Sequence, residues 1–224
     1  MNVLNQSAVA MLSVRELHHC FGRHRVLNGI DLDLAAGECG VLLGANGCGK
    51  STLLSLLSTR LRVQRGSYHL AGLAVAGHGE EIRGRLLFVG HHTHLYGHLT
   101  PLENLLFFAD LHGLRPSESL LRETVAAVGL EKFVEQPVRW FSAGMKKRLA
   151  LGRMLLSRPD LLLLDEPYSA LDAQGVVWLN ERLRLFLQAG GVVVMASHDP
   201  ERVAALPHRP LRMQQGRLVE ERSC

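Results

Sequence analysis

The apolar residues of the chain form short buried runs separated by longer stretches with a helical period. Continuous apolar runs, typical of strands covered on both faces, occur at 86–90, 161–165 and 192–196. Further strands are predicted at residues 13–17, 30–34, 38–43 and 66–72. Because strands and helices alternate toward both ends of the chain, the pattern predicts an α/β domain with a mostly parallel sheet.

The middle of the chain has a different character and contains almost only helical patterns. The sequence Thr100-Pro101-Leu102-Glu103 is a capping box with proline at the first helical position, so a helix begins there and runs to about residue 111. Other helices are predicted at residues 50–59, 117–128, 142–157 and 175–188. We therefore expect a helical subdomain at about residues 91–157, inserted into a single domain that spans residues 11–224. Residues 1–10 are polar and lack a period, which indicates a flexible tail.

Composition narrows the class of protein. The chain has 224 residues, of which 47% are apolar and 21% charged, which suits a folded chain and excludes a disordered tail or a disulfide-stapled miniprotein. No apolar run approaches the roughly 20 residues that a bilayer requires, and no signal peptide is readable. The four cysteines form no CxxC pair, so neither a zinc site nor a disulfide framework is predicted. We expect a soluble, cytoplasmic protein.

The formal charge is +4, and only four of the 25 basic residues are lysines. Such an arginine bias can indicate nucleic-acid binding. Here the arginines are spread along the whole chain, so we interpret the charge as a mildly basic surface and expect no nucleic-acid partner.

The segment from Gly44 to Ser51 matches the phosphate-loop pattern GxxxxGK[ST]. It follows a predicted strand and opens a predicted helix, so backbone N–H groups and a helix N-terminus would surround the phosphates of a nucleotide. Lys50 is expected between the β- and γ-phosphates, and Ser51 is expected to bind Mg²⁺. The predicted nucleotide-binding residues of this segment are Gly44, Ala45, Asn46, Gly47, Cys48, Gly49, Lys50, Ser51 and Thr52.

A second element of the predicted site is the run Leu161-Leu162-Leu163-Leu164 followed by Asp165 and Glu166. It places two carboxylates at the carboxyl end of a buried strand, where open α/β sheets bind ligands. We expect Asp165 to orient Mg²⁺ and Glu166 to act as the general base that activates water.

Additional motifs resemble those of the ATP-binding-cassette (ABC) ATPases. Phe141-Ser142-Ala143-Gly144-Met145 is similar to their signature motif, Ser169-Ala170-Leu171-Asp172 to their D-loop, and Ser197-His198-Asp199 to their switch-histidine segment. Phe21, which lies 23 residues before Gly44, matches their adenine-stacking aromatic residue. The order and spacing fit this family from residue 11 to residue 224.

The resemblance implies a phosphate-loop core with an antiparallel β subdomain and a helical subdomain, and a homodimer that encloses two ATP molecules. In such a dimer Ser142 and Gly144 of one copy would face the nucleotide of the other, and Asp172 would link the two sites. His198 would contact the γ-phosphate and the attacking water, while Phe21 would stack on the adenine. The implied catalytic residues are Lys50, Glu166 and His198, and the implied cofactors are ATP and Mg²⁺.

Two positions depart from the family pattern. A glutamine usual near the start of the helical subdomain is absent, and His91 or His92 stands nearest its place; Met145 replaces the signature glutamine. His91, His92 and His94 also suggest a metal or haem ligand set. We favour the simpler interpretation, in which one histidine replaces the glutamine and the others are solvated.

The chain resembles a lone nucleotide-binding subunit, so an integral membrane permease is the expected partner, with the subunit peripheral on the inner face of the membrane. Among such subunits it is most similar to the short ATPases of haem exporters in cytochrome c maturation. This resemblance rests on Gly90-His91, on the run from Leu99 to Leu105, on Pro137-Val138-Arg139 and on Gln174-Gly175-Val176. The alternatives are an exporter of a drug, lipid or polysaccharide, and a soluble ABC ATPase that acts on nucleic acid or ribosomes.

Overall fold

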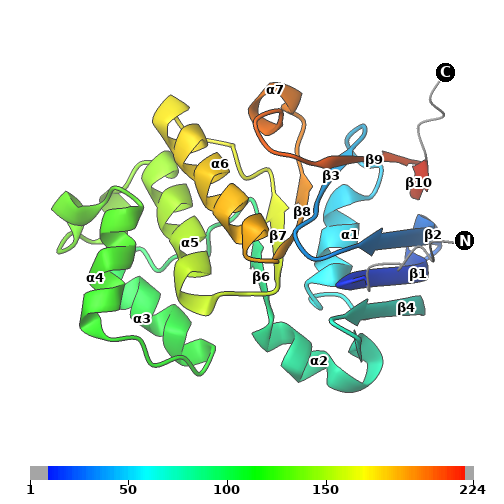
Figure 1. Cartoon of the computed structure of the whole chain (residues 1–224), viewed down its shortest axis with the longest axis horizontal. Helices are drawn as coiled ribbons and strands as arrows, with labels where there is room; N and C mark the ends of the chain where they lie inside the picture. The colour runs from blue at the N-terminus through cyan, green and yellow to red at the C-terminus, as the bar shows by residue number, and fades with distance from the viewer. Residues whose placement is uncertain (1–9, 220–224) are drawn as a thin grey trace, which may run out of the picture.

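The computed structural model describes residues 10–219, which form two β-sheets and a helical lobe (Figure 1). The flexible tail expected at residues 1–10 falls, except for residue 10, outside the described residues. The two sheets and the separate group of helices confirm the predicted α/β class with an antiparallel β subdomain and a helical subdomain.

The larger sheet has the strand order β10-β9-β3-β8-β7-β6, in which β10 alone is antiparallel to its neighbour. Its central strands are almost entirely apolar and buried, because helices cover both faces of a parallel sheet. The bounds are β3 Cys39–Leu43, β6 Leu86–Val89, β7 Leu161–Asp165, β8 Val192–Ala196, β9 Arg209–Gln214 and β10 Arg217–Val219.

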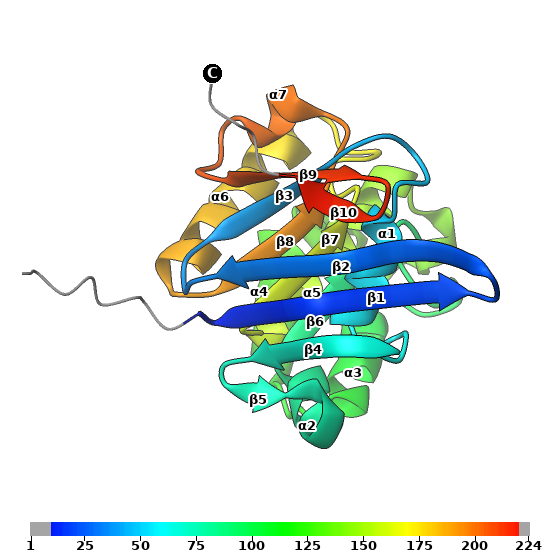
Figure 2. The ribbon, with the colours of Figure 1, turned by 90° about the vertical axis from the view of Figure 1, so that its right-hand side faces the viewer.

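The smaller sheet is antiparallel and lies across the end of the larger one (Figure 2). Its strands, in the order β2-β1-β4-β5, are β1 Leu12–Phe21, β2 His24–Leu34, β4 Arg65–Leu70 and β5 Leu73–Ala74. Helix α1 (Lys50–Leu57) buries four leucines in a core to which both sheets contribute. This packing fixes the start of α1, and with it the preceding loop, relative to both sheets.

The helical lobe lies on the other side of the larger sheet (Figure 1). It contains α3 (Pro101–Leu111), α4 (Glu118–Ala127), α5 (Ala143–Ser157) and two 3₁₀ turns, η1 (Glu131–Phe133) and η2 (Val138–Trp140). The predicted capping box is confirmed, since the Glu103 N–H donates to Thr100 Oγ1 at 3.3 Å and the Thr100 N–H donates to Glu103 Oε2 at 2.8 Å.

Helix α6 (Ala173–Gln188) lies between β7 and β8 in the chain, and the short α7 (Pro200–Val203) follows β8. Helix α2 (Val75–Gly84), α7 and the β9–β10 hairpin were not predicted. Helix α2 contains three glycines, buries only Ile82 and is kinked at His78, so its sequence carries almost no helical signal.

Candidate functional site

Four neighbouring parallel strands of the larger sheet end at the same edge, and each is followed by a predicted functional segment. Val89 pairs with Leu164, Leu164 with Met195, and Ala196 with Leu42, so β6, β7, β8 and β3 end side by side. Segments far apart in the chain therefore meet at one edge, which is where open α/β sheets bind ligands. The segments are Gly90-His91, Asp165-Glu166, Ser197-His198 and the phosphate loop 44–49.

The phosphate loop needs its glycines for conformation and for space. Gly44 has φ 152° and Gly49 has φ 113°, both in the region that glycine favours. A Cβ at Gly44 would collide with the Met213 carbonyl oxygen, and one at Gly49 would lie 2.9 Å from Leu27 Cδ2. The loop is therefore pressed against the β9–β10 hairpin on one side and against β2 on the other.

Lys50 is the first residue of α1, and its side chain turns back under the loop. Its ammonium donates to the Gly44 carbonyl oxygen at 2.7 Å and to the Ala45 carbonyl oxygen at 3.0 Å. A positive charge and a helix N-terminus thus lie together at the loop, an arrangement suited to phosphate groups.

A cleft of about 440 Å³ brings together half of the predicted site residues. It is lined by Asn46, Gly47, Gly49, Lys50, Ser51, Thr52, Asp165 and Glu166, together with Val26 and His91. The hydroxyl of Ser51 and the carboxylate of Asp165 are oxygen donors of the kind that Mg²⁺ prefers, so the residues fit this ion.

Glu166 and His198 are in contact beside the cleft, with 2.8 Å between Oε1 and Nδ1. The Glu166 side chain is 25% exposed, whereas that of His198 is 76% exposed. Glu166 has φ 49°, an unusual backbone conformation for a residue with a side chain, and its N–H donates to the Ala196 carbonyl oxygen at 3.0 Å. The backbone of Glu166 is thus held by Ala196, and its carboxylate is held by His198.

Three predicted residues lie outside this cleft within the single chain. Ser142 caps α5, accepting from the Met145 N–H at 3.2 Å, and Asp172 caps α6, accepting from the Gly175 N–H at 2.7 Å. A Cβ at Gly144 would lie 2.6 Å from the Ala170 carbonyl oxygen, so only glycine permits this approach. The signature segment therefore packs on the D-loop segment of its own chain.

Phe21 stands 52% exposed at the tip of the β1–β2 hairpin, with its ring edge-on to His19 at 4.8 Å. Val26 of the same hairpin lines the cleft, but Phe21 itself is not among the lining residues. The structure therefore does not bring Phe21 to the cleft, although Phe21 shares a hairpin with a residue that lines it.

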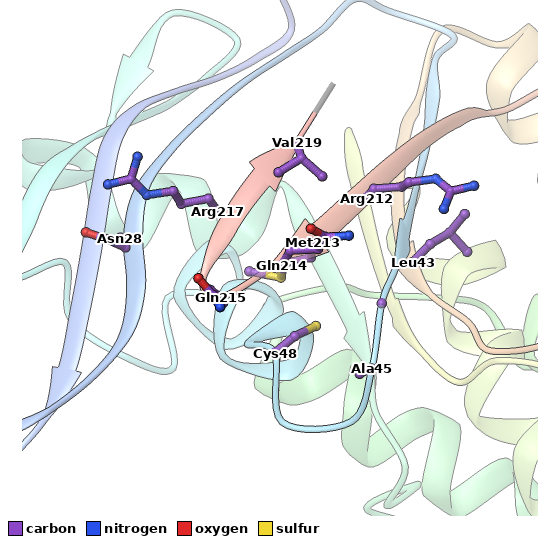
Figure 3. Close-up of a pocket in the computed structure, with 11 residues that line it drawn as sticks. Asn28, Leu43, Ala45, Cys48, Arg212, Met213, Gln214, Gln215, Arg217 and Val219 are labelled. Carbon is purple, nitrogen blue, oxygen red and sulfur yellow. The ribbon is translucent and has the colours of Figure 1, made fainter. Parts of the chain in front are cut away.

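The Cys48 side chain faces a second cavity, of about 580 Å³, under the β9–β10 hairpin (Figure 3). Its sulfur lies 4.0 Å from Lys50 Nζ. Gly44 and Ala45 also line this cavity, so the phosphate loop separates it from the cleft that contains Asp165 and Glu166.

Of the three histidines near residue 91, only His91 lines the cleft. The ring centroids of His91 and His92 are 5.5 Å apart, and those of His92 and His94 are 6.4 Å apart. Among residues 10–219, no three histidine, cysteine or acidic side chains converge on a site that could hold a metal ion. His91 is therefore the histidine of this group that lies at the cleft, and which of His91 and His92 takes the place of the usual glutamine stays a prediction.

Three polar side chains near the cleft, the buried Asn104 and Lys147 and the partly buried Arg153, were not predicted as site residues. Asn104 exchanges hydrogen bonds with the Tyr96 backbone, while Lys147 and Arg153 of α5 donate to carbonyls of residues 90–94. A sequence signal existed for Lys147, because it falls on the same helical stripe as the buried Ala150, Leu151 and Met154.

Comparison with known proteins agrees with this geometry. A family model described as "ABC transporter" matches residues 27–169, which contain the phosphate loop, the signature segment and the Asp165-Glu166 pair. The chain belongs to the ABC transporter family. The resemblance inferred from the motifs is thus confirmed, and with it the assignment of the chain as an ABC-type ATPase.

Individual ABC relatives match over most of their length. The chain is 36% identical over 211 residues to the cytochrome c biogenesis ATP-binding export protein CcmA of Escherichia coli O157:H7, covering 94% of this chain and 100% of the relative. It is 38% identical over 173 residues to the protein of the same name from Cupriavidus necator, covering 77% and 76% of the two chains.

A solved structure described as the ATP binding subunit of an ABC transporter superimposes with a TM-score of 0.86 at 26% identity, covering 93% of this chain and 88% of that one. The fold is therefore that of an ABC nucleotide-binding subunit. In the part of the chain that the structure describes, no helix is both long and apolar enough to cross a membrane.

Proposed function

We propose that this ABC ATPase powers an exporter required for cytochrome c biogenesis, with haem or a haem-related compound as the exported substrate. Relatives that bear this function in their names match the chain along most of its length. The observation that carries the chemical part of the proposal is the Glu166–His198 contact at 2.8 Å beside a cleft that also holds Lys50 and Asp165.

In the proposed reaction the phosphate loop and Lys50 bind the phosphates of ATP. Ser51 and Asp165 would hold Mg²⁺, which supplies positive charge to the phosphate oxygens when bound. The Lys50 ammonium, already directed to the loop carbonyls, would turn to the phosphates, and the N-terminus of α1 would add the partial charge of its free N–H groups.

Glu166 is proposed as the general base. As the water oxygen attacks the γ-phosphorus and the bond to the β-phosphate oxygen breaks, Glu166 accepts the proton that the water loses. The His198 contact and the backbone hydrogen bond to Ala196 hold the carboxylate in one place, so little reorganisation is needed during the reaction.

Ser142, Gly144 and Asp172 require a second copy of the chain for their proposed roles. Ser142 and Gly144 lie at the N-terminus of α5, outside the cleft of their own chain, and this helix end would face the nucleotide held by the other copy. Asp172, which caps α6, would lie where the two sites meet. Phe21, which needs no second copy for its role, would stack on the adenine. An ATP-dependent homodimer therefore completes the site.

The membrane partner is proposed to dock on an exposed apolar surface of the helical lobe. This surface, termed the lobe patch, consists of Tyr96, Leu106, Phe107 and Leu111. The rings of Tyr96 and Phe107 meet edge to face at 4.7 Å, and Leu111 is 72% exposed. Docking of an integral membrane permease here would hold the subunit on the cytoplasmic face of the membrane and bury this apolar surface.

Complementation tests the proposed cellular role. The chain, expressed together with candidate membrane subunits from the same organism, would replace the related exporter of an Escherichia coli strain that lacks its own, and haem-stained gels would measure mature c-type cytochrome. Restored cytochrome supports the proposal, provided that the Glu166→Gln variant does not restore it. An active ATPase that restores none, although the membrane subunits assemble with it, would contradict cytochrome c biogenesis and favour a different exported compound.

A further inference from the structure

Residues 90–94, termed the strap, connect the core to the helical lobe directly beside the cleft. The strap leaves the end of β6 at Gly90, and its second residue, His91, lines the cleft with Lys50 and Glu166. Whatever fixes the backbone of the strap therefore fixes where the His91 ring lies relative to the bound phosphates.

Lys147 of α5 holds the first residue of the strap. Its side chain is only 2% exposed, and Nζ donates to the Gly90 carbonyl oxygen at 3.1 Å. That oxygen belongs to the peptide unit joining Gly90 to His91, and a peptide unit is planar. Holding the oxygen therefore fixes the direction in which the His91 backbone leaves β6.

The charges around Lys147 explain why an ammonium is tolerated there. Burial lowers the pKa of Lys147, while the charges of Asp165 and Glu166 act in the opposite direction and favour the ammonium. Hydrogen bonds from a charged donor are stronger than neutral ones. The hydrogen bond from the Lys147 ammonium to the Gly90 carbonyl oxygen is therefore stronger than one from a neutral donor would be.

The other end of the strap is held by the same helix. Arg153 donates from Nη1 to the Thr93 carbonyl oxygen at 3.0 Å and from Nη2 to the His94 carbonyl oxygen at 2.9 Å. Burial lowers the pKa of Arg153 to about 10, and its guanidinium lies 5.3 Å from the centre of the Phe108 ring. Two cations two turns apart on α5 thus hold the strap at both ends.

Lys147 stands five residues after Ser142, so α5 carries the signature segment at its start and both strap contacts further along. We infer that Lys147 is a positioning residue for ATP hydrolysis, which ties α5 to the Gly90 carbonyl and thereby sets the place of His91 in the cleft. A displacement of the signature end of α5 moves His91 within the same chain. This inference rests on the proposed role of the cleft in hydrolysis.

Substitution of Lys147 in the full-length protein tests the inference. Lys147→Met keeps the length and apolar stem but removes the donor, and Lys147→Gln keeps an N–H donor without the charge. We expect kcat to fall about tenfold for Lys147→Met and less for Lys147→Gln, with the ATP KM changed less than about twofold in both. Lys132→Met makes the same chemical change at an exposed lysine of the helical lobe and is the matched control.

A double-mutant cycle with His91→Ala separates positioning from a merely structural role. If Lys147 acts through His91, Lys147→Met lowers kcat by less than about twofold in the His91→Ala background. Multiplicative losses, equal losses for the Met and Gln variants, or an unchanged kcat for Lys147→Met would each overturn the inference. Should Lys147→Met fail to fold, the same cycle with Lys147→Gln decides between the two outcomes.

The result is separable from the role proposed for the cleft itself. Failure of that role would appear as wild-type turnover in Glu166→Gln, whatever Lys147 does. Failure of the inference alone would appear as loss of turnover in Glu166→Gln, together with multiplicative losses of kcat when Lys147→Met and His91→Ala are combined.

Discussion

The His198 Nδ1 atom lies 2.8 Å from Glu166 Oε1, at the point where β8 and β7 end side by side. The two residues are 32 positions apart in the chain, and the register of Asp165 with Ala196 brings them together. The geometry of this proposed hydrolytic pair therefore depends on strand pairing as well as on the side chains, because a shift of register would separate the two residues.

Replacing Glu166 by glutamine tests the proposed general base. The amide is the same size but does not accept a proton from water, so turnover should fall by a factor of about 10²–10⁴ while ATP still binds. Phosphate release and ATP titration would measure the two effects, and size-exclusion chromatography should detect an ATP-bound dimer. Glu131→Gln, at an exposed position of η1, is the control, and wild-type turnover in Glu166→Gln would refute the assignment.

Alkylation of Cys48 should weaken ATP binding. The thiol lies 4.0 Å from Lys50 Nζ and on the opposite side of the loop from the cleft, so an added group would push the loop and its lysine out of position. Bound Mg-ATP should hold the loop and so slow the reaction of Cys48 with a thiol reagent. Mass spectrometry would measure the rate of this reaction. The Cys48→Ser variant accounts for reaction at the other cysteines, and unchanged ATP affinity in the modified protein would count against the prediction.

Placing a charge in the lobe patch should release the membrane partner. We expect Phe107→Glu to abolish co-purification with the permease, because the buried interface would then hold an unpaired carboxylate, while the ATPase activity of the isolated subunit changes less than about twofold. Leu185→Glu puts the same charge on an exposed leucine of α6 and should keep the complex. Retention of the permease by Phe107→Glu would exclude this surface as the dock.

The capping box of α3 should make a pH-dependent contribution to stability. Thr100→Ala should lower the free energy of unfolding by about 1 kcal/mol, measured by denaturant titration at pH 7. Hydrogen bonds from the Thr100 N–H and then its hydroxyl lower the pKa of Glu103, so the folded protein binds this proton more weakly than the unfolded chain.

The contribution of Glu103 is therefore present above the pKa of the unfolded chain and disappears as pH falls through the lowered folded value. The stability difference between wild type and Glu103→Ala should shrink from pH 7 to pH 3. A difference that stays constant or grows would contradict this reasoning, and Glu131→Ala provides an exposed carboxyl for comparison.

The sheet edge where β3 and β7 end could be predicted from the sequence, because each polar segment there directly follows the strand that positions it. An apolar run that ends in Asp165-Glu166 predicts both a buried strand and the polar group at its end, and the glycines before Lys50 predict their own loop. The capping box likewise fixes the start of α3 from four consecutive residues.

Contacts between distant segments were not predictable in this way. Nothing near Gly90 in the sequence indicates that its carbonyl oxygen accepts a hydrogen bond from a lysine 57 positions away. The sequence also does not show that His91, rather than His92 or His94, lines the cleft. Helix α2 forms despite Gly77 and Gly79 because tertiary packing of Ile82 outweighs its weak helical propensity.

Two segments of the chain join the helical lobe to the core, and they lie at opposite edges of the larger sheet. The lobe leaves at the strap, beside the cleft, and returns at the opposite edge of the sheet, where Asp160 meets Arg85 through an ion pair at 2.5 Å and a backbone hydrogen bond at 2.8 Å. The return point is suited to serve as a pivot, and the strap as the far end of a lever. A pull by the membrane subunit on the lobe patch would then rotate the lobe about Asp160, and the displacement would be largest at the strap, where His91 lines the cleft.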